Sequence, residues 1–372
     1  MNHHTWGVLS QMYGVPGVSR CLVLAGYWTP EAAAEQPAAI EQLATEYSRC
    51  GADVTQTFTF QAAALQGSSF PPDSTVTTEE VNMAACAIAC RVRASRGGLV
   101  AGGLTQTGLY TPGITSKEET QAIYRRNLAT LVAGGVDFII LEFFRFITEM
   151  EWAIEAAVET GLPVGAMLCM GPAGEEGGAS VEHCAIRMAK AGATMVGVNC
   201  LFDPPVCLSV MARMKAGLQS AGLEGTHLMA QPVGWRVPEG NSFGSAALPE
   251  FPYSLEPRQV TRWEARRWAR EAYSLGIRYI GGCCGFEPYH IRAMAEELAE
   301  ERGGLPEASN KSDHDLRIHS ELEGKGLARY KGKGSLRWWM EQQPCSGRPL
   351  STVMAPPTTF DKPALLSKGI IN

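Results

Sequence analysis

Two adjacent cysteines, Cys283 and Cys284, stand between glycines in the stretch Tyr279–Phe286. A disulfide between neighbouring residues is disfavoured because the small ring it closes is strained. Glycine permits backbone angles that other residues avoid, so a bend at Gly282 or Gly285 could direct both sulfur atoms toward one point. Two thiolates at one point favour a soft metal, and zinc is the commonest. The alternative is that both cysteines are small buried hydrophobic side chains, as free cysteines often are.

The cysteine pair lies in the last of a series of short apolar runs that alternate with longer amphipathic segments. Most of these runs have the length of a strand, and several are rich in Val and Ile, as is typical of strands buried on both faces of a parallel sheet. The expected strands are Ala52–Phe60, Leu99–Thr105, Asp137–Phe144, Pro163–Met170, Met195–Cys200, His227–Pro232 and Tyr279–Gly285. The expected helices are Thr29–Arg49, Thr78–Ser95, Ser116–Gly134, Thr148–Gly161, Ser180–Gly192, Ser209–Gly222 and Pro257–Gly276.

This alternation predicts an α/β fold with a parallel sheet, and eight such units would make a (β/α)8 TIM barrel. One more strand before Thr29 would complete the eight, and Trp6–Ser10 and Cys21–Ala25 are the candidates for this divergent first strand. A doubly wound open sheet is the alternative fold. We expect the barrel to span residues 1–304.

After residue 304 the alternation of strands and helices stops. Residues 305–372 contain charge clusters, a Trp338-Trp339 pair and several prolines. We expect this C-terminal extension to make subunit contacts or to be partly disordered.

A third cysteine is placed to join the pair. In a barrel the active site lies at the C-terminal ends of the strands, and Cys200 follows Val198-Asn199 at such an end. Counting the missing strand, Cys200 ends the sixth strand and the pair ends the eighth, so the two ends can meet above the barrel mouth. We therefore predict a zinc site with the ligands Cys200, Cys283 and Cys284. Three protein ligands leave a fourth position open, as in catalytic sites. A centre with three thiolates suits an incoming thiol that attacks an electrophilic carbon, for example in methyl transfer.

Other predicted strand ends carry groups that suit a charged substrate. Glu142 lies near the end of its apolar run and is placed to bind an ammonium group, although a salt bridge at the barrel rim is the alternative. Aromatic residues could wall a dry pocket and make cation–π contacts with an onium ligand, although each of them taken alone is more often plain packing. These aromatic residues are Trp28, Phe58, Phe60, Phe143 and Phe144.

The composition excludes several functional classes. The chain of 372 residues is 45% hydrophobic and 19% charged, and its net charge of −6 argues against a nucleic-acid partner. No apolar run reaches the roughly 18 to 20 residues needed to cross a bilayer, and the first residues show no secretory signal. The eleven cysteines are irregularly spaced, unlike a disulfide framework. We therefore expect a cytoplasmic protein that binds no membrane.

Several motifs resemble the zinc-dependent homocysteine S-methyltransferases, and among them the members that use betaine. The motifs are Val198-Asn199-Cys200, Gly281–Gly285, Leu248–Pro252, Leu255–Arg258, Thr261–Trp263, Arg278–Arg292, Trp28–Ala33 and Gln56–Phe60. A fainter match lies at Ser346–Pro349, and the similarity as a whole runs from about Ala25 to Pro306.

This resemblance implies a (β/α)8 barrel with one zinc ion on the three cysteines and with homocysteine bound as a zinc thiolate. It implies that Glu142 contacts the homocysteine amino group and that Trp28 belongs to the methyl-donor pocket, where we also place Phe60. The methyl group of betaine would pass to sulfur, giving dimethylglycine and methionine. In the family the C-terminal extension wraps a neighbouring subunit, so we expect a homo-oligomer, either a dimer or a tetramer.

Two positions depart most from the family pattern. The family's first strand ends in Asp-Gly-Gly-Phe, whose Asp also holds the homocysteine amino group, and this motif is absent; counting back from Trp28 places that Asp near Ser10. Betaine users carry a Tyr near the betaine carboxylate where this chain has Gln61, whose amide can still donate a hydrogen bond to the substrate. A further family Tyr is replaced by Phe143. Relatives that use S-methylmethionine lack the first Tyr. The alternatives are therefore an S-methylmethionine donor, or an inactive zinc-binding homologue that acts as a subunit partner.

Overall fold

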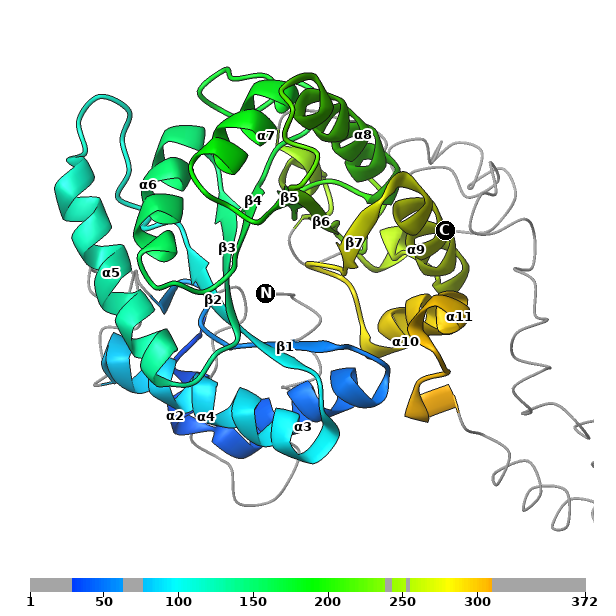
Figure 1. The fold of residues 1–372 in the computed structure, drawn as a ribbon. Helices are drawn as coiled ribbons and strands as arrows, with labels where there is room; N and C mark the ends of the chain where they lie inside the picture. The colour runs from blue at the N-terminus through cyan, green and yellow to red at the C-terminus, as the bar shows by residue number, and fades with distance from the viewer. Residues whose placement is uncertain (1–28, 63–75, 238–242, 252–254, 310–372) are drawn as a thin grey trace, which may run out of the picture.

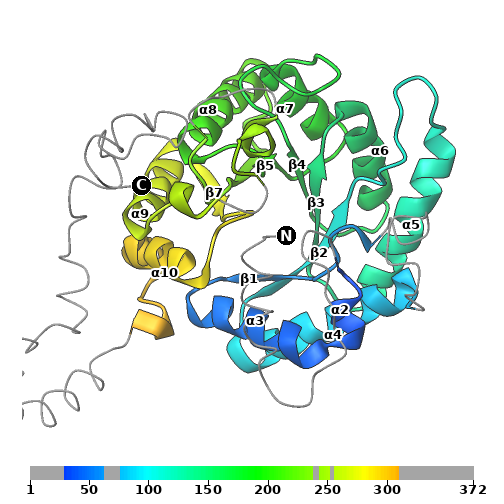
Figure 2. The same ribbon diagram turned by 180° about the vertical axis from the view of Figure 1, so that it is seen from behind.

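The strands form one parallel sheet that curls around a central axis, with helices on its outer side (Figures 1 and 2). The computed structural model describes residues 29–62, 76–237, 243–251 and 255–309. Its strands are β1 (Val54–Gln56), β2 (Leu99–Thr105), β3 (Phe138–Phe144), β4 (Val164–Leu168), β5 (Met195–Asn199), β6 (His227–Gln231) and β7 (Ile277–Ile280). Each strand pairs in parallel with the next one along the chain.

This topology confirms the predicted α/β fold of the (β/α) barrel type. A doubly wound sheet would reverse its strand order at a switch point, and the order of the described strands runs from β1 to β7 without reversal. Among these strands β1 and β7 are the two edges of the sheet. The candidates for the first strand, Trp6–Ser10 and Cys21–Ala25, lie outside the described residues, as do residues 310–372 of the expected extension.

Side-chain caps fix where most of the long helices begin. The helices are α2 (Ala32–Glu35), α3 (Pro37–Arg49), α4 (Thr78–Arg96), α5 (Lys117–Ala133), α6 (Ile147–Val158), α7 (Val181–Lys190), α8 (Pro204–Ser220), α9 (Arg262–Leu275), α10 (Pro288–Glu297) and α11 (Ala299–Arg302), with 3-10 turns η2 (Gly244–Ala247), η3 (Glu256–Arg258) and η4 (Glu307–Ser309). Thr77 and Thr261 form capping boxes at α4 and α9. Ser116, Ser180 and Asp203 cap α5, α7 and α8. None of the helices in the described ranges is long and apolar enough to cross a membrane.

The expected helix Thr29–Arg49 is divided into α2 and α3, with Gln36 between them and Pro37 as the first residue of α3. Two other helices begin elsewhere than predicted because of the caps. α8 starts at Pro204 rather than Ser209, since Asp203 accepts a hydrogen bond from the first turn and proline is well suited to the first helical position. α9 starts at Arg262 rather than Pro257, because the preceding threonine completes the capping box and the earlier residues form the separate turn η3.

The first and last strands are also shorter at their C-terminal ends than the apolar runs suggested. β1 stops at Gln56, and the chain then turns so that the Thr59 nitrogen donates to the Thr57 carbonyl. β7 stops at Ile280, so the cysteine pair lies in the loop after the strand rather than in the strand itself. The loop is free of the alternation of side chains that a strand would impose.

Apolar side chains fill two layers, one between the sheet and the helices and one inside the curled sheet. The inner layer consists of Ala101, Phe138, Ile140, Met167 and Met229. Toward the C-terminal ends of the strands, polar side chains replace these apolar ones on β1, β3, β5 and β6. They are Gln56, Glu142, Asn199 and Gln231, and they mark the end of the barrel at which chemistry can take place.

Candidate metal and substrate site

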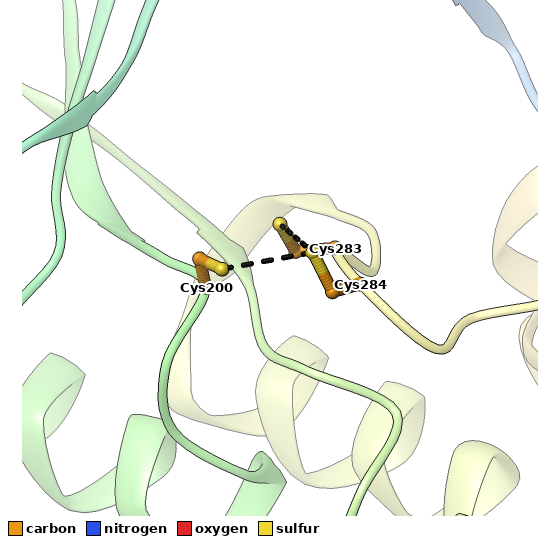
Figure 3. Close-up of side chains that lie close together, drawn as sticks. All are labelled: Cys200, Cys283 and Cys284. Atoms are coloured by element: carbon orange, nitrogen blue, oxygen red, sulfur yellow. Dashed lines mark hydrogen bonds between the residues drawn. The ribbon is translucent and has the colours of Figure 1, made fainter. Parts of the chain in front are cut away.

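Three cysteine side chains converge beyond the C-terminal ends of β5 and β7 (Figure 3). We call Cys200, Cys283 and Cys284 the thiol cluster. The Sγ atom of Cys284 lies 3.8 Å from that of Cys200 and 3.9 Å from that of Cys283, and all three Sγ atoms lie within 4.8 Å of one another. The structure thus brings together the three cysteines that the sequence singled out, although they come from loops about 80 residues apart.

Glycines allow the loop after β7 to present both sulfur atoms on one side. A Cβ atom at Gly282 would overlap the ring of Phe286, and Gly285 has a φ of +84°, which favours glycine. Two backbone hydrogen bonds tie the loop to the segment after β6: the Cys283 nitrogen donates to the Pro232 carbonyl, and the Gly234 nitrogen donates to the Cys284 carbonyl. A Cβ atom at Gly234 would collide with the backbone of Gly285, so this close approach requires glycine.

The other half of the cluster is held in an unusual backbone conformation. Cys200 and Leu201 have φ angles of 62° and 57°, in the left-handed region that residues with a Cβ seldom adopt. The Cys200 nitrogen donates to the Gln231 carbonyl at 2.9 Å, and Asp203 holds the following turn by accepting from the nitrogens of Val206 and Val237. Strain of this kind persists only where surrounding contacts enforce it, and it is concentrated at functional sites.

The spacing of the thiol cluster fits a tetrahedral metal ion. Zinc–sulfur bonds of about 2.3 Å place two ligand sulfur atoms about 3.8 Å apart in a tetrahedron. The two Sγ–Sγ distances at Cys284 are 3.8 and 3.9 Å. Three sulfur ligands suit zinc and other soft or borderline ions rather than magnesium or calcium. The donor set and its spacing therefore fit a zinc ion.

Hydrogen bonds within the cluster shift the pKa values of its thiols in opposite directions. The thiols of Cys200 and Cys283 both donate to the Cys284 sulfur, and these bonds hold the pKa of Cys284 well below its usual value. Interaction with Cys283 and then with Cys284, together with burial, raises the pKa of Cys200. Metal ligation requires thiolates, so binding of a cation to this cluster releases the remaining thiol protons.

Glu142 lies inside the curled sheet beside the thiol cluster, where two amides hold it. Its Oε1 accepts a hydrogen bond from Gln56 Nε2 at 2.5 Å, and its Oε2 lies 3.5 Å from Asn199 Nδ2. Asn199 Nδ2 also lies 4.0 Å from the Cys283 sulfur, so this amide links the acid to the thiols. Burial raises the pKa of Glu142, and the bond from Gln56 partly opposes that rise. The sequence indicated Glu142 but gave no role to Gln56 or Asn199.

A cavity of about 410 Å³ adjoins these groups. Its lining includes Glu142, Cys283, Cys284 and the aromatic rings of Phe58 and Phe60. Phe60 packs edge to face against Phe143, with ring centroids 5.4 Å apart. The acid and two of the thiols therefore face one space whose lining includes the aromatic residues Phe58 and Phe60.

Phe144 and Gln61 are not among the described residues that line this cavity. Phe144 does not belong to the wall: its ring is fully buried against Tyr124 in the layer under the helices, because successive strand residues point to opposite faces. Gln61 has a φ of 63° and its nitrogen donates to Thr105 Oγ1, and it is not among the described residues that line the cavity. Trp28 lies outside the described residues.

The remaining described cysteines lie apart from the three that converge, with one exception. Cys86 and Cys184 are buried in α4 and α7 and donate to backbone carbonyls, as expected for structural cysteines. Cys169, at the end of β4, is buried in the same apolar cluster as Cys200 and Cys284, and its sulfur lies 3.8 Å from Asn199 Oδ1. Burial raises the pKa of Cys169, so it packs there as a neutral thiol.

Comparison with known sequences gives one consistent result. Residues 18–298 match the family model for homocysteine S-methyltransferase. Betaine–homocysteine S-methyltransferase 1 of Danio rerio is 46% identical over 338 residues, which cover 91% of this chain and 83% of that protein. S-methylmethionine–homocysteine S-methyltransferase BHMT2 of Rattus norvegicus is 45% identical over 345 residues, which cover 91% of this chain and 90% of that protein.

Comparison with solved structures supports the fold. The metallated form of the homocysteine methyltransferase MmuM from Escherichia coli superposes with a TM-score of 0.58 at 17% identity, covering 77% of this chain and 92% of that one. Its oxidized form gives a TM-score of 0.57. At this level of identity the likeness shows a shared fold.

Proposed function

The chain belongs to the homocysteine S-methyltransferase family, and we propose that it transfers a methyl group from betaine to the sulfur of homocysteine, giving dimethylglycine and methionine. The observation that carries this proposal is the convergence of three thiols at metal-ligand spacing beside a buried acid. The relative from Danio rerio, named for betaine and homocysteine, supports the choice of substrates.

We propose that zinc is the metal of the thiol cluster. Cys200, Cys283 and Cys284 would hold it, and Cys283 and Cys284 face the cavity where a substrate would enter. When bound, a zinc ion with three protein ligands keeps one position open and lowers the pKa of a thiol that enters it. Asn199 would orient Cys283 and Glu142 relative to each other through its amide.

Glu142 is proposed to bind the ammonium group of homocysteine. A buried carboxylate is costly unless a cation or sufficient donors accompany it. Its two amide contacts come from neutral groups, so an ammonium group would add the opposite charge. The amino-acid end of the substrate would then be fixed while the sulfur lies at the thiol cluster, and this double attachment supplies the orientation that methyl transfer requires.

The aromatic wall is proposed to receive the methyl donor. In the reaction the sulfur forms a bond to the methyl carbon, the carbon–nitrogen bond of betaine breaks, and its electron pair stays on nitrogen. The donor nitrogen thereby loses its positive charge. Phe58 and Phe60 offer aromatic faces that attract an onium ion and exclude water, so they favour binding of the cationic donor over release of the ion into solvent.

S-methylmethionine is the second candidate donor, and Gln61 is the observation that favours it. This residue stands where betaine users carry a tyrosine near the betaine carboxylate, and its amide replaces the phenolic hydroxyl. The relative from Rattus norvegicus is named for S-methylmethionine. Both donors are onium ions that become neutral on losing a methyl group, so the thiol cluster and the aromatic wall suit either one.

Assembly and location are proposed from the sequence. We propose a cytoplasmic homo-oligomer, a dimer or tetramer, in which residues 305–372 contact a neighbouring copy. Light scattering of the full chain tests the assembly: the mass of a single chain would contradict it.

The test of function uses protein purified under reducing conditions. We expect about one zinc ion per chain and the formation of labelled methionine from homocysteine and methyl-labelled betaine. Running the assay with S-methylmethionine in parallel decides the donor. Bound zinc without turnover of either donor would overturn the enzymatic proposal in favour of an inactive homologue, and protein that stays metal-free in the presence of zinc would overturn the assignment of the ligands.

A further inference from the structure

One amide at the cavity has a buried acceptor atom without a hydrogen-bond partner. Gln231 is the last residue of β6, and its side chain lines the cavity with Glu142, Cys283 and Cys284. Its Oε1 atom is buried, yet it receives no hydrogen bond within the described ranges of the chain. Leaving a buried carbonyl oxygen unpaired is unfavourable, so such an atom in a cavity indicates a donor that the folded chain does not itself provide.

The backbone around Gln231 gives its side chain a fixed place beside the thiols. Its Cα is paired in register with that of Asn199, whose amide reaches Glu142 and Cys283, and paired residues of parallel strands face the same side of a sheet. A Cβ atom at Gly281 would lie only 3.1 Å from Gln231 Cγ and 3.2 Å from its Nε2, so the glycine leaves the space that this side chain fills. The Gln231 carbonyl also accepts from the nitrogen of Cys200.

The charges around the cavity favour a cationic donor for this acceptor. Glu142 and the thiolates are acidic groups, while Arg302, a cationic residue on the cavity lining, is already paired with Asp53. The amides of Gln56 and Asn199 are directed at Glu142, which leaves Gln231 as an amide of this layer available to a ligand. The methylated nitrogen of betaine carries no N–H group, whereas homocysteine carries a primary ammonium. The donor that fits is therefore the ammonium group of the thiol substrate, which the proposed function places beside Glu142.

We infer that Gln231 accepts a hydrogen bond from the α-ammonium group of the thiol substrate, which also contacts the neighbouring Glu142. This inference rests on the proposed function, because it assigns a contact for homocysteine. It also supplies a second acceptor for the ammonium group in a chain that lacks the Asp-Gly-Gly-Phe motif. Gln231 thereby selects amino thiols over thiols without an amino group.

The test compares two ligands on the zinc-loaded protein by calorimetry. Homocysteine carries the ammonium group, and 4-mercaptobutyrate is the same thiol acid without it. Gln231→Met keeps the length of the side chain but removes the acceptor. We expect this variant to bind homocysteine roughly 10- to 100-fold more weakly, the usual range for a hydrogen bond to a charged group, and to bind 4-mercaptobutyrate as the wild type does. Gln231→Glu, which retains an acceptor, should recover homocysteine binding.

Controls separate this inference from folding and from the proposed function. Gln121→Met removes a buried amide that bonds Trp152 and Glu155 far from the cavity, and it should leave both affinities unchanged. Zinc content should equal that of the wild type in every variant. If the wild type binds homocysteine no better than 4-mercaptobutyrate, the proposed function fails and the inference with it. If the wild type discriminates and Gln231→Met discriminates equally, or loses both ligands alike, the inference alone is overturned.

Discussion

Replacing Gly282 by alanine should damage the thiol cluster without touching any of its sulfur atoms. A Cβ atom at this position would lie 2.5 Å or less from three atoms of the Phe286 ring. Carbon atoms normally make contact at about 3.5 Å, so the loop or the ring must move by at least about 1 Å. Phe286 is 2% exposed and belongs to the main core, so the ring has little room to yield. The backbone that carries the adjacent Cys283 should move instead.

We expect two measurable consequences of Gly282→Ala. Overpacking of this kind typically costs about 1 to 3 kcal/mol of folding free energy. Displacing residues that orient metal ligands commonly lowers metal affinity about 10- to 100-fold, and we expect a loss in this range. Zinc affinity is measured by competition with a coloured chelator under reducing conditions, and stability is measured by urea unfolding of the same samples.

Gly225→Ala is the matched control, because a Cβ atom there meets no atom within 4 Å. It should bind zinc as the wild type does. Equal zinc affinity in Gly282→Ala, Gly225→Ala and the wild type would refute the reasoning that the tight contact with Phe286 fixes the position of the cysteine pair.

Three further substitutions test the roles of individual side chains. Cys284→Ala should abolish both zinc binding and methyl transfer. Cys86→Ala, at a buried position of α4, should lower the unfolding midpoint and leave the zinc content unchanged; equal zinc loss in both variants would contradict the cluster. Burial raises the pKa of Glu142 in the folded state, so this group binds more protons folded than unfolded, and its contribution to stability is lost as pH rises through the folded pKa. Glu142→Gln should therefore make the ligand-free protein more stable at neutral pH, and it should weaken homocysteine binding. A variant that is less stable than the wild type at pH 7 but not at pH 4 would contradict the predicted direction of the stability change. Gln61→Tyr should shift donor preference toward betaine in a competition assay with S-methylmethionine, and an unchanged ratio would argue against its placement near the donor carboxylate.

The thiol cluster could be predicted from sequence because parallel strands bring their C-terminal ends together. Once Cys200 and the cysteine pair were assigned to strand ends, no knowledge of the side-chain conformations was needed to expect them at one point. Glu142 lies at this end of the sheet for the same reason, since it stands near the C-terminal end of β3. The loop after β7 is also indicated by its glycines. A side chain at Gly282 would overlap the Phe286 ring, and Gly285 adopts a positive φ that other residues seldom take.

The supporting contacts could not be predicted, because they depend on register and on which side of a strand each residue faces. The pairing of β3 with β4 shifts between Leu141 and Phe144, and Phe143 takes a φ of 62° there. Phe143 therefore packs against Phe60 while Phe144 enters the outer core, whereas the sequence pattern alone suggests one aromatic wall for both. The buried, unpaired oxygen of Gln231 likewise emerges only when its neighbours are known in three dimensions.

The most direct test of the central claim is X-ray absorption at the zinc edge, before and after homocysteine is added. The thiol cluster provides three sulfur ligands, and the substrate thiol should add a fourth at about 2.3 Å. The number of sulfur neighbours of the zinc ion should rise from three to four when homocysteine is added. A sulfur count that stays the same, or zinc surrounded mainly by oxygen and nitrogen, would contradict it.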